Sequence, residues 1–468
     1  MNRKIAVTLG AIGGSLVSVC SVIEKIGGFV EKVVPIPSWL WLVLFLLGII
    51  STFVFIFLDK IVAFFTPDIS WRNDGFAYMT IEARFRDNFN KTGYKFKGHN
   101  EDDDHYAIFC QQKVMSATNI TDMFPSKDSK DSKDREDSAN EYRAKLKKLM
   151  EKYNVSVTDD IQYLFANTPF IFAEHYYFYH ILKLFNGADP WAAVKAESLK
   201  RIVDTPLENN RIAKLIKAYN TNRFETILNQ SVFANSTDLS QTSARVKNTE
   251  AYNRDGVFDY VVNDRDDVQN YFENRLNDSK TIHIIVDNSG LELISDLILG
   301  AYLINKGRAG RIVYHHNVLP IFVSDAVAAD FEAAIESIKK IDTEVGNKIE
   351  EMRKSGKMEF APNAFWNMPF PFKEMPERLL CELNKENVGM VIIKGDLNYR
   401  RLVEDKKWRI TKSIKSRVNY LERPILILRS LKSDTLLGID GATVKRYDLA
   451  QPNWKITGDY GMIQFIKR

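Results

Sequence analysis

The sequence predicts an α/β fold: a doubly wound α/β/α sheet domain with a helical N-terminal subdomain, preceded by two transmembrane helices. Three observations lead to this expectation. Two long uncharged segments open the chain, helical patterning follows them, and from residue 281 short β-branched runs alternate with helices. Such alternation is typical of a parallel sheet that is covered on both faces. The expected divisions are residues 1–66, 67–275 and 276–468.

Residues 5–23 and 39–58 contain no charged side chain. A helix rises about 1.5 Å per residue and the hydrocarbon core of a bilayer is about 30 Å thick, so each segment is long enough to cross it. Trp39 and Trp41 stand where interfacial aromatic residues are found. We expect the two segments to form a transmembrane hairpin that anchors a two-pass membrane protein.

Lysine and arginine residues lie mainly outside this hairpin, which favours a cytoplasmic soluble domain. Two alternatives stay open for residues 5–23. Arg3 and Lys4 are also typical of the basic start of a cleaved signal peptide, and the two segments could form a buried hairpin in a soluble protein. Gly10 and Gly14 would let helices approach closely within one chain or between chains, which permits a homo-oligomer.

The middle of the chain predicts helices around one polar stretch. The segment 126–137 repeats Ser-Lys-Asp and offers nothing apolar to bury, so we expect a disordered charged loop over residues 124–140. Residues 141–153 then read as a helix. Residues 165–185 are rich in aromatic side chains and predict a buried helix, with His175 and His180 as core residues rather than metal ligands.

From residue 281 each predicted element has its own pattern. Short runs of β-branched residues predict buried strands, and a longer amphipathic segment that ends near Gly307 predicts a helix. The expected strands are Thr281–Val286, Arg311–His315, Gly389–Lys394 and Pro424–Arg429, with Leu319–Val323 extended; the expected helices are Leu291–Asn305 and Asp330–Met352.

Polar side chains follow the predicted strands. Asp287 and Asn288 come after the first, Asp325 closes the extended segment, and the last two strands lead into Asp396–Asn398 and Arg429–Lys432. In a doubly wound, Rossmann-like sheet, ligands bind at the carboxyl ends of the strands. Hard oxygen ligands beside cations suit a divalent metal that faces a phosphate. Each cluster alone could be only a turn or a helix cap, but agreement among four segments favours a site.

The composition excludes several other classes. The chain has 468 residues with 64 Lys and Arg against 60 Asp and Glu, so its net charge of +4 gives no case for nucleic-acid binding. A hydrophobic content of 45% and a charged content of 26% exclude a wholly disordered chain. Three scattered cysteines are too few for a disulfide framework or a cysteine zinc site.

The segment KGDLNYRRL, residues 394–402, closely resembles the signature of the damage-control phosphatase family, also described as acidic-residue carboxyl methyltransferase-like. RSLK, residues 429–432, resembles the motif of its metal-dependent subfamily. Other segments resemble the family in the same order: GFAYMTIEAR (75–84), PFIFAEHYYFYHI (169–181), IVDNSGLELISDLI (285–298), LPIFVSDA (319–326), FWNMPFPFKEMP (365–376) and WKITGDYGMIQF (454–465).

The resemblance implies a phosphatase that uses a divalent metal (Mn, Co, Ni or Mg) to hydrolyse small phosphorylated metabolites, in particular sugar phosphates. Asp287, Asn288 and Asp325 would hold the metal. Either Asp287 or Asp396 would orient the attacking water, and the residues do not decide between them. The expected substrate contacts are Glu292, Asp396, Leu397, Asn398, Tyr399, Arg400, Arg429 and Lys432.

Two departures from the family pattern leave other functions open. The segment 233–240 retains Asn235 and Asp238 but lacks the tryptophan that precedes the asparagine in relatives, and His316-Asn317 stands where relatives carry Gly-Lys. A pocket cation is therefore expected to be missing. The alternatives are S-adenosylmethionine-dependent carboxyl methyl transfer, disfavoured by the lack of an evident glycine-rich loop, and a ligand-sensing membrane effector with a degenerate enzyme domain.

Overall fold

The computed structural model describes residues 77, 80–100, 102–110, 117–123, 132–153, 155, 167–234 and 259–468. All of them belong to one compact unit that begins at Pro67. The predicted hairpin segments 5–23 and 39–58 lie outside the described residues, as do Asn235 and Asp238.

The expectation of a two-pass membrane protein with a cytoplasmic soluble domain is corrected by the structure. Among the described residues, no helix combines the length and the apolar character that crossing a bilayer requires.

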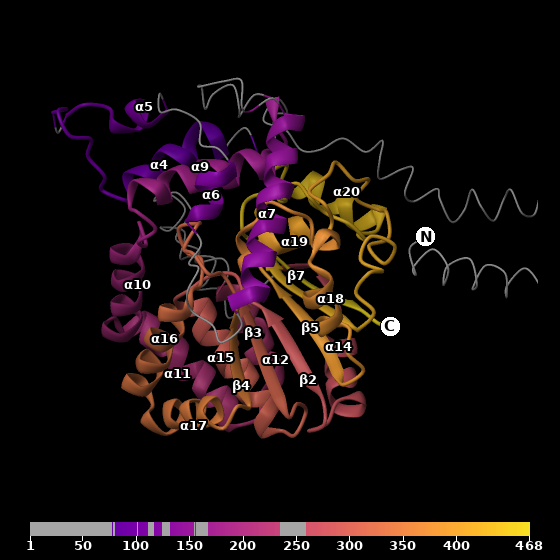
Figure 1. Cartoon of the computed structure of the whole chain (residues 1–468). Helices are drawn as coiled ribbons and strands as arrows, with labels where there is room; N and C mark the ends of the chain where they lie inside the picture. The colour runs from indigo at the N-terminus through magenta and orange to yellow at the C-terminus, as the bar shows by residue number, and fades with distance from the viewer. Residues whose placement is uncertain are drawn as a thin grey trace, which may run out of the picture. The chain divides into compact units, whose positions relative to one another are not determined.

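A seven-stranded mixed sheet forms the centre of the described unit, in the order β1-β7-β6-β5-β2-β3-β4 (Figure 1). β2 to β6 run parallel to one another, β7 is antiparallel to β6, and β1 is parallel to β7. The α/β prediction is confirmed for this sheet. The strands are β1 (Asp259–Asn263), β2 (Thr281–Ile285), β3 (Arg311–His316), β4 (Met358–Pro362), β5 (Val388–Lys394), β6 (Ile425–Ser430) and β7 (Tyr460–Ile466).

Alternate residues of the central strands face two separate hydrophobic cores, as the period of a β-strand requires. In β5, Val391 and Ile393 belong to one core, while Met390 and Ile392 belong to the other. Every residue of β5 and β6 is buried. A strand that is buried on both faces needs a continuous apolar run, which is why the patterning found these strands.

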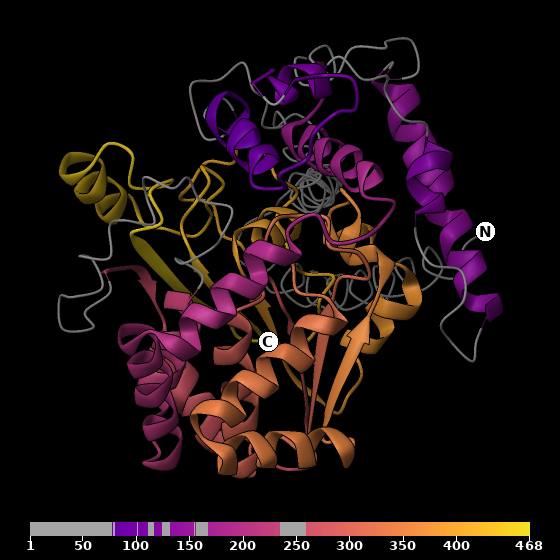
Figure 2. The same cartoon turned by 90° about the vertical axis from the view of Figure 1, so that its left-hand side faces the viewer.

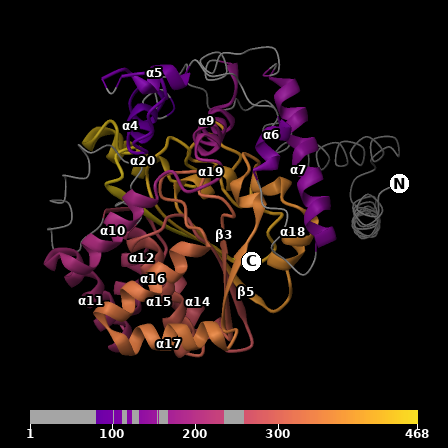
Figure 3. The same cartoon turned by 60° about the vertical axis from the view of Figure 1, so that its left-hand side comes forward.

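Helices cover both faces of the sheet. One core packs beneath α10 (Ala192–Asp204), α11 (Pro206–Asn220), α12 (Phe224–Phe233), α14 (Arg265–Arg275), α15 (Leu291–Asn305), α16 (Ala328–Ile341) and α17 (Thr343–Lys354). The other packs beneath α18 (Glu377–Leu383), α19 (Asp396–Leu402), α20 (Gly441–Ala450) and two short 3-10 turns, η5 (Ala364–Asn367) and η6 (Phe372–Glu374). Figure 3 shows α15, α16 and α17 on one side of the strands and α18 on the other.

The N-terminal helices extend the second core. They are η1, a π-helical turn (Thr80–Arg84), α4 (Phe85–Asn90), α5 (His105–Cys110), α6 (Ala117–Asp122), α7 (Ser132–Lys152) and α9 (Phe170–Leu184). In Figure 2 the indigo helices lie at the top of the view, and the long violet helix α7 runs down one side from there. α9 is the predicted aromatic helix, and its His175 and His180 are buried as expected. Phe178 of α9 packs on Phe322, with ring centroids 4.6 Å apart.

Three predicted elements differ from the structure. α7 begins at Ser132, so residues 132–140 of the expected loop are helical. Lys, Glu, Arg and Ala favour helices even where nothing apolar is available. Residues 319–323 form no strand, although Asn288 and Asp325 make an isolated β-bridge. Asp342 interrupts the expected helix 330–352, because its extended backbone and side chain cap α17.

The strand order places the chain's reversal point between β2 and β5. From β2 the sheet proceeds outward through β3 and β4, whereas β5 and β6 build the other side. A crevice opens at such a switch point, beyond the carboxyl ends of the two central strands. Asp287 follows β2 and Asp396 follows β5, so the fold brings together residues that lie more than a hundred positions apart.

The cap at Asp342 gives a test of the α16–α17 break. The Asp342 side chain accepts a hydrogen bond of 3.0 Å from the backbone N–H of Val345. We expect Asp342→Ala to lower the free energy of unfolding by about 1 kcal/mol, the usual value of an N-cap. Asp342→Asn keeps the acceptor and should retain most of the stability in urea unfolding. Equal losses in both variants would contradict the capping role.

Candidate active site

A pocket lies beyond the carboxyl ends of β2, β5 and β6, where η1, α4 and α9 close over the sheet. It holds about 590 Å³ of space without protein atoms, counting its open mouth. Four carboxylates and three cationic side chains line it, together with polar and aromatic residues. The lining residues are Thr80, Arg84, Phe85, Asn88, Glu174, Phe178, Asp287, Asn288, Phe322, Ser324, Asp325, Asp396, Leu397, Arg400 and Lys432.

The three predicted metal ligands meet at one wall of this pocket. The backbone N–H of Ser289 donates to Ser324 O at 2.7 Å, and that of Ala326 donates to Asp287 O at 3.1 Å. The Ser324 hydroxyl donates to Asn288 Oδ1 at 2.6 Å, and Asn288 Nδ2 donates to Asp287 Oδ2 at 3.0 Å. These bonds hold two carboxylates and an amide oxygen side by side, the hard donors that Mg²⁺ and Mn²⁺ prefer.

Asp325 is held from behind by two residues that the sequence analysis did not assign. Asn317 Nδ2 donates to Asp325 Oδ2 at 2.5 Å, and Lys195 Nζ donates to the backbone oxygen of Asp325 at 2.7 Å. The buried Lys195 ammonium also pairs with Asp189 at 2.8 Å and with Asp330 at 3.1 Å. Asn317 does not line the pocket, so this position supplies support for Asp325 where the sequence suggested only a missing cation.

Gly395 allows the ends of the two central strands, β2 and β5, to lie close together. Its φ of +80° is a conformation that residues with a Cβ rarely adopt. A Cβ at this position would lie 1.8 Å from Asp287 Oδ2. Asn398, one turn further on, donates from Nδ2 to Val286 O and to Lys394 O, both at 3.0 Å. Asn398 therefore ties β2 to β5 and does not line the pocket.

Asp396 faces the pocket with one oxygen anchored. Arg429 Nη2 donates to Asp396 Oδ1 at 2.6 Å, and the backbone N–H of Lys432 donates to the same oxygen at 3.1 Å. The Arg429 guanidinium is fully buried and lies over the Tyr399 ring, 4.1 Å from its centroid. Arg429 and Tyr399 thus stand behind Asp396, whereas Leu397 and Lys432 line the pocket.

Arg400 crosses the pocket floor toward α9. It donates to both oxygens of Asp405, at 2.9 and 2.8 Å, and to Glu174 at 2.7 Å. Burial by itself would lower the pKa of Arg400, but Asp405 and Glu174 outweigh it and raise that pKa. Burial raises the pKa of Glu174 despite the attraction of Arg400. The pair locks the helical layer onto the sheet at the site.

Glu292 lies beneath the predicted metal ligands and does not line the pocket. Its Oε2 accepts a hydrogen bond of 2.8 Å from Asn288, and its Oε1 lies 3.3 Å from the fully buried Lys394 ammonium. Lys394 also pairs with Asp296 at 2.9 Å. Burial raises the pKa of Asp296 to about 6, although Lys394 opposes that rise. This network orients the Asn288 side chain, because the amide nitrogen is directed to Glu292 and the amide oxygen to the other side.

Sequence reasoning missed the pocket wall that the N-terminal helices supply. Thr80, Arg84 and Asn88 recur at every fourth position and share one helical face. Thr80 Oγ1 and Asn88 Oδ1 are buried, and neither has a hydrogen-bond partner within the described residues. Buried polar groups are normally paired, so these two atoms are suited to bind a ligand. The recurrence of a polar residue at every fourth position is the sequence signal that could have revealed this wall.

Comparisons with known proteins agree on one family. Residues 110–446 match the damage-control phosphatase ARMT1-like domain. Proteins called damage-control phosphatase ARMT1 are 34% identical over 198 residues in Rattus norvegicus and 33% over 192 in Homo sapiens, in each case 39% of this chain and 43% of the relative. The Bos taurus protein is 30% identical over 261 residues, 52% of this chain and 59% of the relative.

These alignments therefore cover less than two thirds of the relatives' length. Among solved structures, a DUF89 family protein from Pyrococcus horikoshii is similar with a TM-score of 0.37 and 17% identity. That similarity covers 71% of this chain and 90% of the other.

Gly395 offers a sharp test of the site. We expect Gly395→Ala to cost about 1–3 kcal/mol of stability from the glycine-only backbone, and also to weaken Mn²⁺ binding because the methyl group displaces the Asp287 carboxylate. Gly356→Ala is the matched control, since Gly356 also has a positive φ of +75° but open space around it. Urea unfolding and calorimetry measure the two effects. Unchanged Mn²⁺ affinity in a folded Gly395→Ala would contradict this arrangement.

Proposed function

We propose, for a chain that belongs to the damage-control phosphatase ARMT1-like domain family, that it is a metal-dependent phosphomonoesterase acting on small phosphorylated metabolites. The observation that supports this most directly is the convergence of Asp287, Asn288 and Asp325 on one wall of the pocket, with Lys432 among the residues that line it. Oxygen donors beside a cation are the combination that binds a metal ion together with a phosphoryl group.

The charge balance of the pocket supports the need for a metal. Four carboxylates outnumber the three cations that line it. A phosphate dianion entering this pocket alone would meet an excess of negative charge. A divalent cation reverses that excess, so the donor set fits a metal ion. When bound, such an ion polarises a phosphoryl oxygen and lowers the pKa of a coordinated water.

The contacts favour different tasks for the two carboxylates that the sequence left undecided. Asp287 lies against Asn288 and Gly395 within the group of oxygen donors, which suits a metal ligand. Asp396 has one oxygen anchored by Arg429 and by the backbone of Lys432, which fixes the plane of its carboxylate. We assign Asp396 to orient the attacking water and Lys432 to stabilise negative charge on the phosphoryl group.

The opposite wall supports a substrate with hydroxyl groups, such as a sugar phosphate. Asn88 Oδ1 can only accept a hydrogen bond, and the Thr80 hydroxyl can donate or accept. Substrate hydroxyl groups satisfy both atoms. Phe85, Phe178 and Phe322 supply apolar surface to the same pocket. A flexible polyol phosphate would thus be held at both ends.

The other two functions have less support. Carboxyl methyl transfer would use Glu292 next to a methyl donor, but Glu292 is only 1% exposed and its contacts are Asn288 and Lys394. The ligand-sensing effector depended on the membrane hairpin, and it is not proposed further.

The test of the phosphatase is phosphate release by the full chain across a panel of phosphorylated metabolites, with and without Mn²⁺, Co²⁺, Ni²⁺ or Mg²⁺. We expect metal-dependent release, and Asp287→Ala should lower kcat/KM by roughly 10²-fold or more, the scale of losing electrostatic stabilisation. Asp266→Ala, an exposed change on α14, is the matched control and should leave the rate unchanged. A folded, metal-loaded protein that releases no phosphate from any member of the panel would sink the proposal.

The hydroxyl-binding wall gives a separate prediction. We expect Asn88→Ala and Thr80→Val each to raise KM for a sugar phosphate about fivefold, since one hydrogen bond contributes about 1 kcal/mol. The same variants should leave KM for p-nitrophenyl phosphate nearly unchanged, because its aryl group has no hydroxyl to bind. Equal losses on both substrates would show a structural effect instead of recognition.

A further inference from the structure

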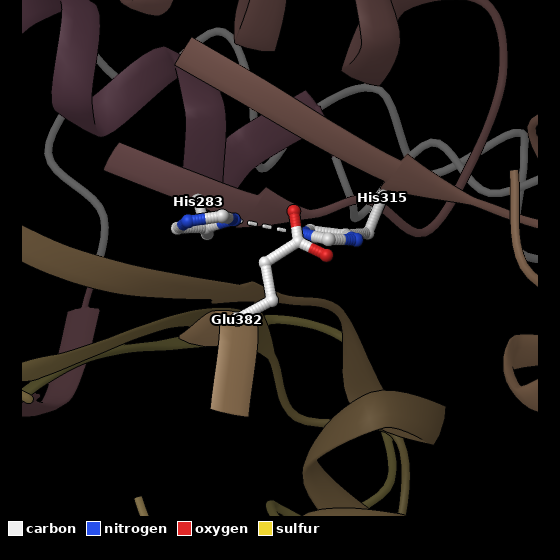
Figure 4. A group of neighbouring side chains, drawn as sticks. All are labelled: His283, His315 and Glu382. Carbon is white, nitrogen blue, oxygen red and sulfur yellow. Dashed lines mark hydrogen bonds between the residues drawn. The ribbon is translucent and has the colours of Figure 1, made fainter. Parts of the chain in front are cut away.

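A second group of potential metal ligands lies beneath the sheet, away from the pocket. His283 is on β2 and His315 is on the neighbouring β3, and both side chains point to the same face of the sheet. His283 Nδ1 and His315 Nε2 are 2.8 Å apart, and the two side chains are almost completely buried. Figure 4 shows the rings edge to edge, joined by this hydrogen bond.

Glu382 completes the group from α18, the helix that covers this face. Its carboxylate is directed at the two rings (Figure 4). One ligand atom from each of the three residues lies within 4.8 Å of the others. Glu382 is partly exposed whereas the histidines are buried.

We propose that His283, His315 and Glu382 form a binding site for a borderline transition-metal ion such as Zn²⁺. Two imidazoles and one carboxylate, with water as the fourth ligand, are a recurrent zinc donor set. This site does not depend on the proposed phosphatase function. His283 and Asp287 are four residues apart along an extended segment, which separates the two sites by roughly 13 Å.

The state of the two rings suits metal binding. Burial, together with the nearby charges of Arg311 and Lys385, lowers the pKa of His283 to about 4. Burial also holds the pKa of His315 well below its usual value. Both rings are therefore neutral at pH 7. The ring that donates the hydrogen bond must move its proton to its other ring nitrogen before the facing nitrogen can bind a metal. A single hydrogen bond links the two rings. His315 Nδ1 is buried and has no hydrogen-bond partner in the described part of the chain.

The distance between the two facing nitrogens needs to increase only slightly for both to bind one metal ion. Nitrogen ligands at about 2.0–2.1 Å from a tetrahedral zinc ion lie roughly 3.3 Å from each other. The observed 2.8 Å must therefore open by a few tenths of an ångström. The bound ion would link β2, β3 and α18, and so fasten the helix to the strand that carries Asp287 at its end.

The donor types distinguish the two sites. Oxygen donors at Asp287, Asn288 and Asp325 suit Mg²⁺ or Mn²⁺, whereas imidazole nitrogen favours Zn²⁺ and Co²⁺. Co²⁺ bound to nitrogen ligands in a tetrahedral site absorbs visible light strongly, which makes it a direct probe of this site.

The experiment uses the full chain after removal of metals with a chelator, titrated with Co²⁺ and with Zn²⁺. We expect a visible absorption band with Co²⁺ that disappears when Zn²⁺ is added, and a rise in Tm with Zn²⁺. The wild type should bind one more equivalent of Zn²⁺ per chain than Glu382→Gln. Glu382→Gln changes only a partly exposed helix position, so it should fold, and it should weaken Zn²⁺ binding at least tenfold.

Asp287→Ala is the matched control. It should leave the Co²⁺ band and the Tm response to Zn²⁺ unchanged while it loses the oxygen-donor site. His283→Asn provides a second variant within the histidine pair and should abolish the band. A band of equal intensity in wild type, Glu382→Gln and His283→Asn would overturn the proposal, as would a wild type that shows no band and no zinc-dependent rise in Tm. Loss of phosphatase activity alone would not affect it.

Discussion

The contact between the ends of β2 and β5 is the constraint on which the site depends. The Asp287 carboxylate packs directly on Gly395, and Asn398 donates hydrogen bonds to Val286 O, just past the end of β2, and to Lys394 O at the end of β5. Parallel pairing brings the two ends level, so residues that follow each strand enter the same crevice. A side chain at position 395 would part the strands at the point where Asp287 and Asp396 approach each other.

Buried charges hold this contact in place. Lys394 pairs with Glu292 and Asp296 below Asn288, and Lys195 pairs with Asp189 and Asp330 behind Asp325. Removing such groups from water costs several kcal/mol per ion, and only paired partners with good geometry offset that cost. A network of this kind is a weak source of stability, but it permits few alternative arrangements. Its effect here is to orient Asn288 and Asp325 rather than to strengthen the core.

Much of the sheet and of the site was predictable, for reasons that particular elements show. β5 and β6 are buried on both faces, so their continuous apolar runs stood out, and the polar residues after them pointed to a ligand-binding edge. β1 and β4 are partly exposed at the two edges of the sheet, and they gave no such signal. The helix break at Asp342 was also missed, because one capping side chain decided it. Thr80 and Asn88 were missed as pocket residues since only tertiary packing brings η1 and α4 over the sheet.

Local patterns in the sequence were enough to identify the central strands of the sheet and the residue types that follow them, because burial and turn chemistry leave local signals. The tertiary structure decided which of these residues face the pocket. Leu397 and Lys432 line the pocket. The other expected substrate contacts that lie behind the lining residues are Arg429, Tyr399, Asn398 and Glu292. It also decided that His283 and His315 share a hydrogen bond. Strand order and side-chain direction depend on contacts between distant segments, and no local pattern contains them.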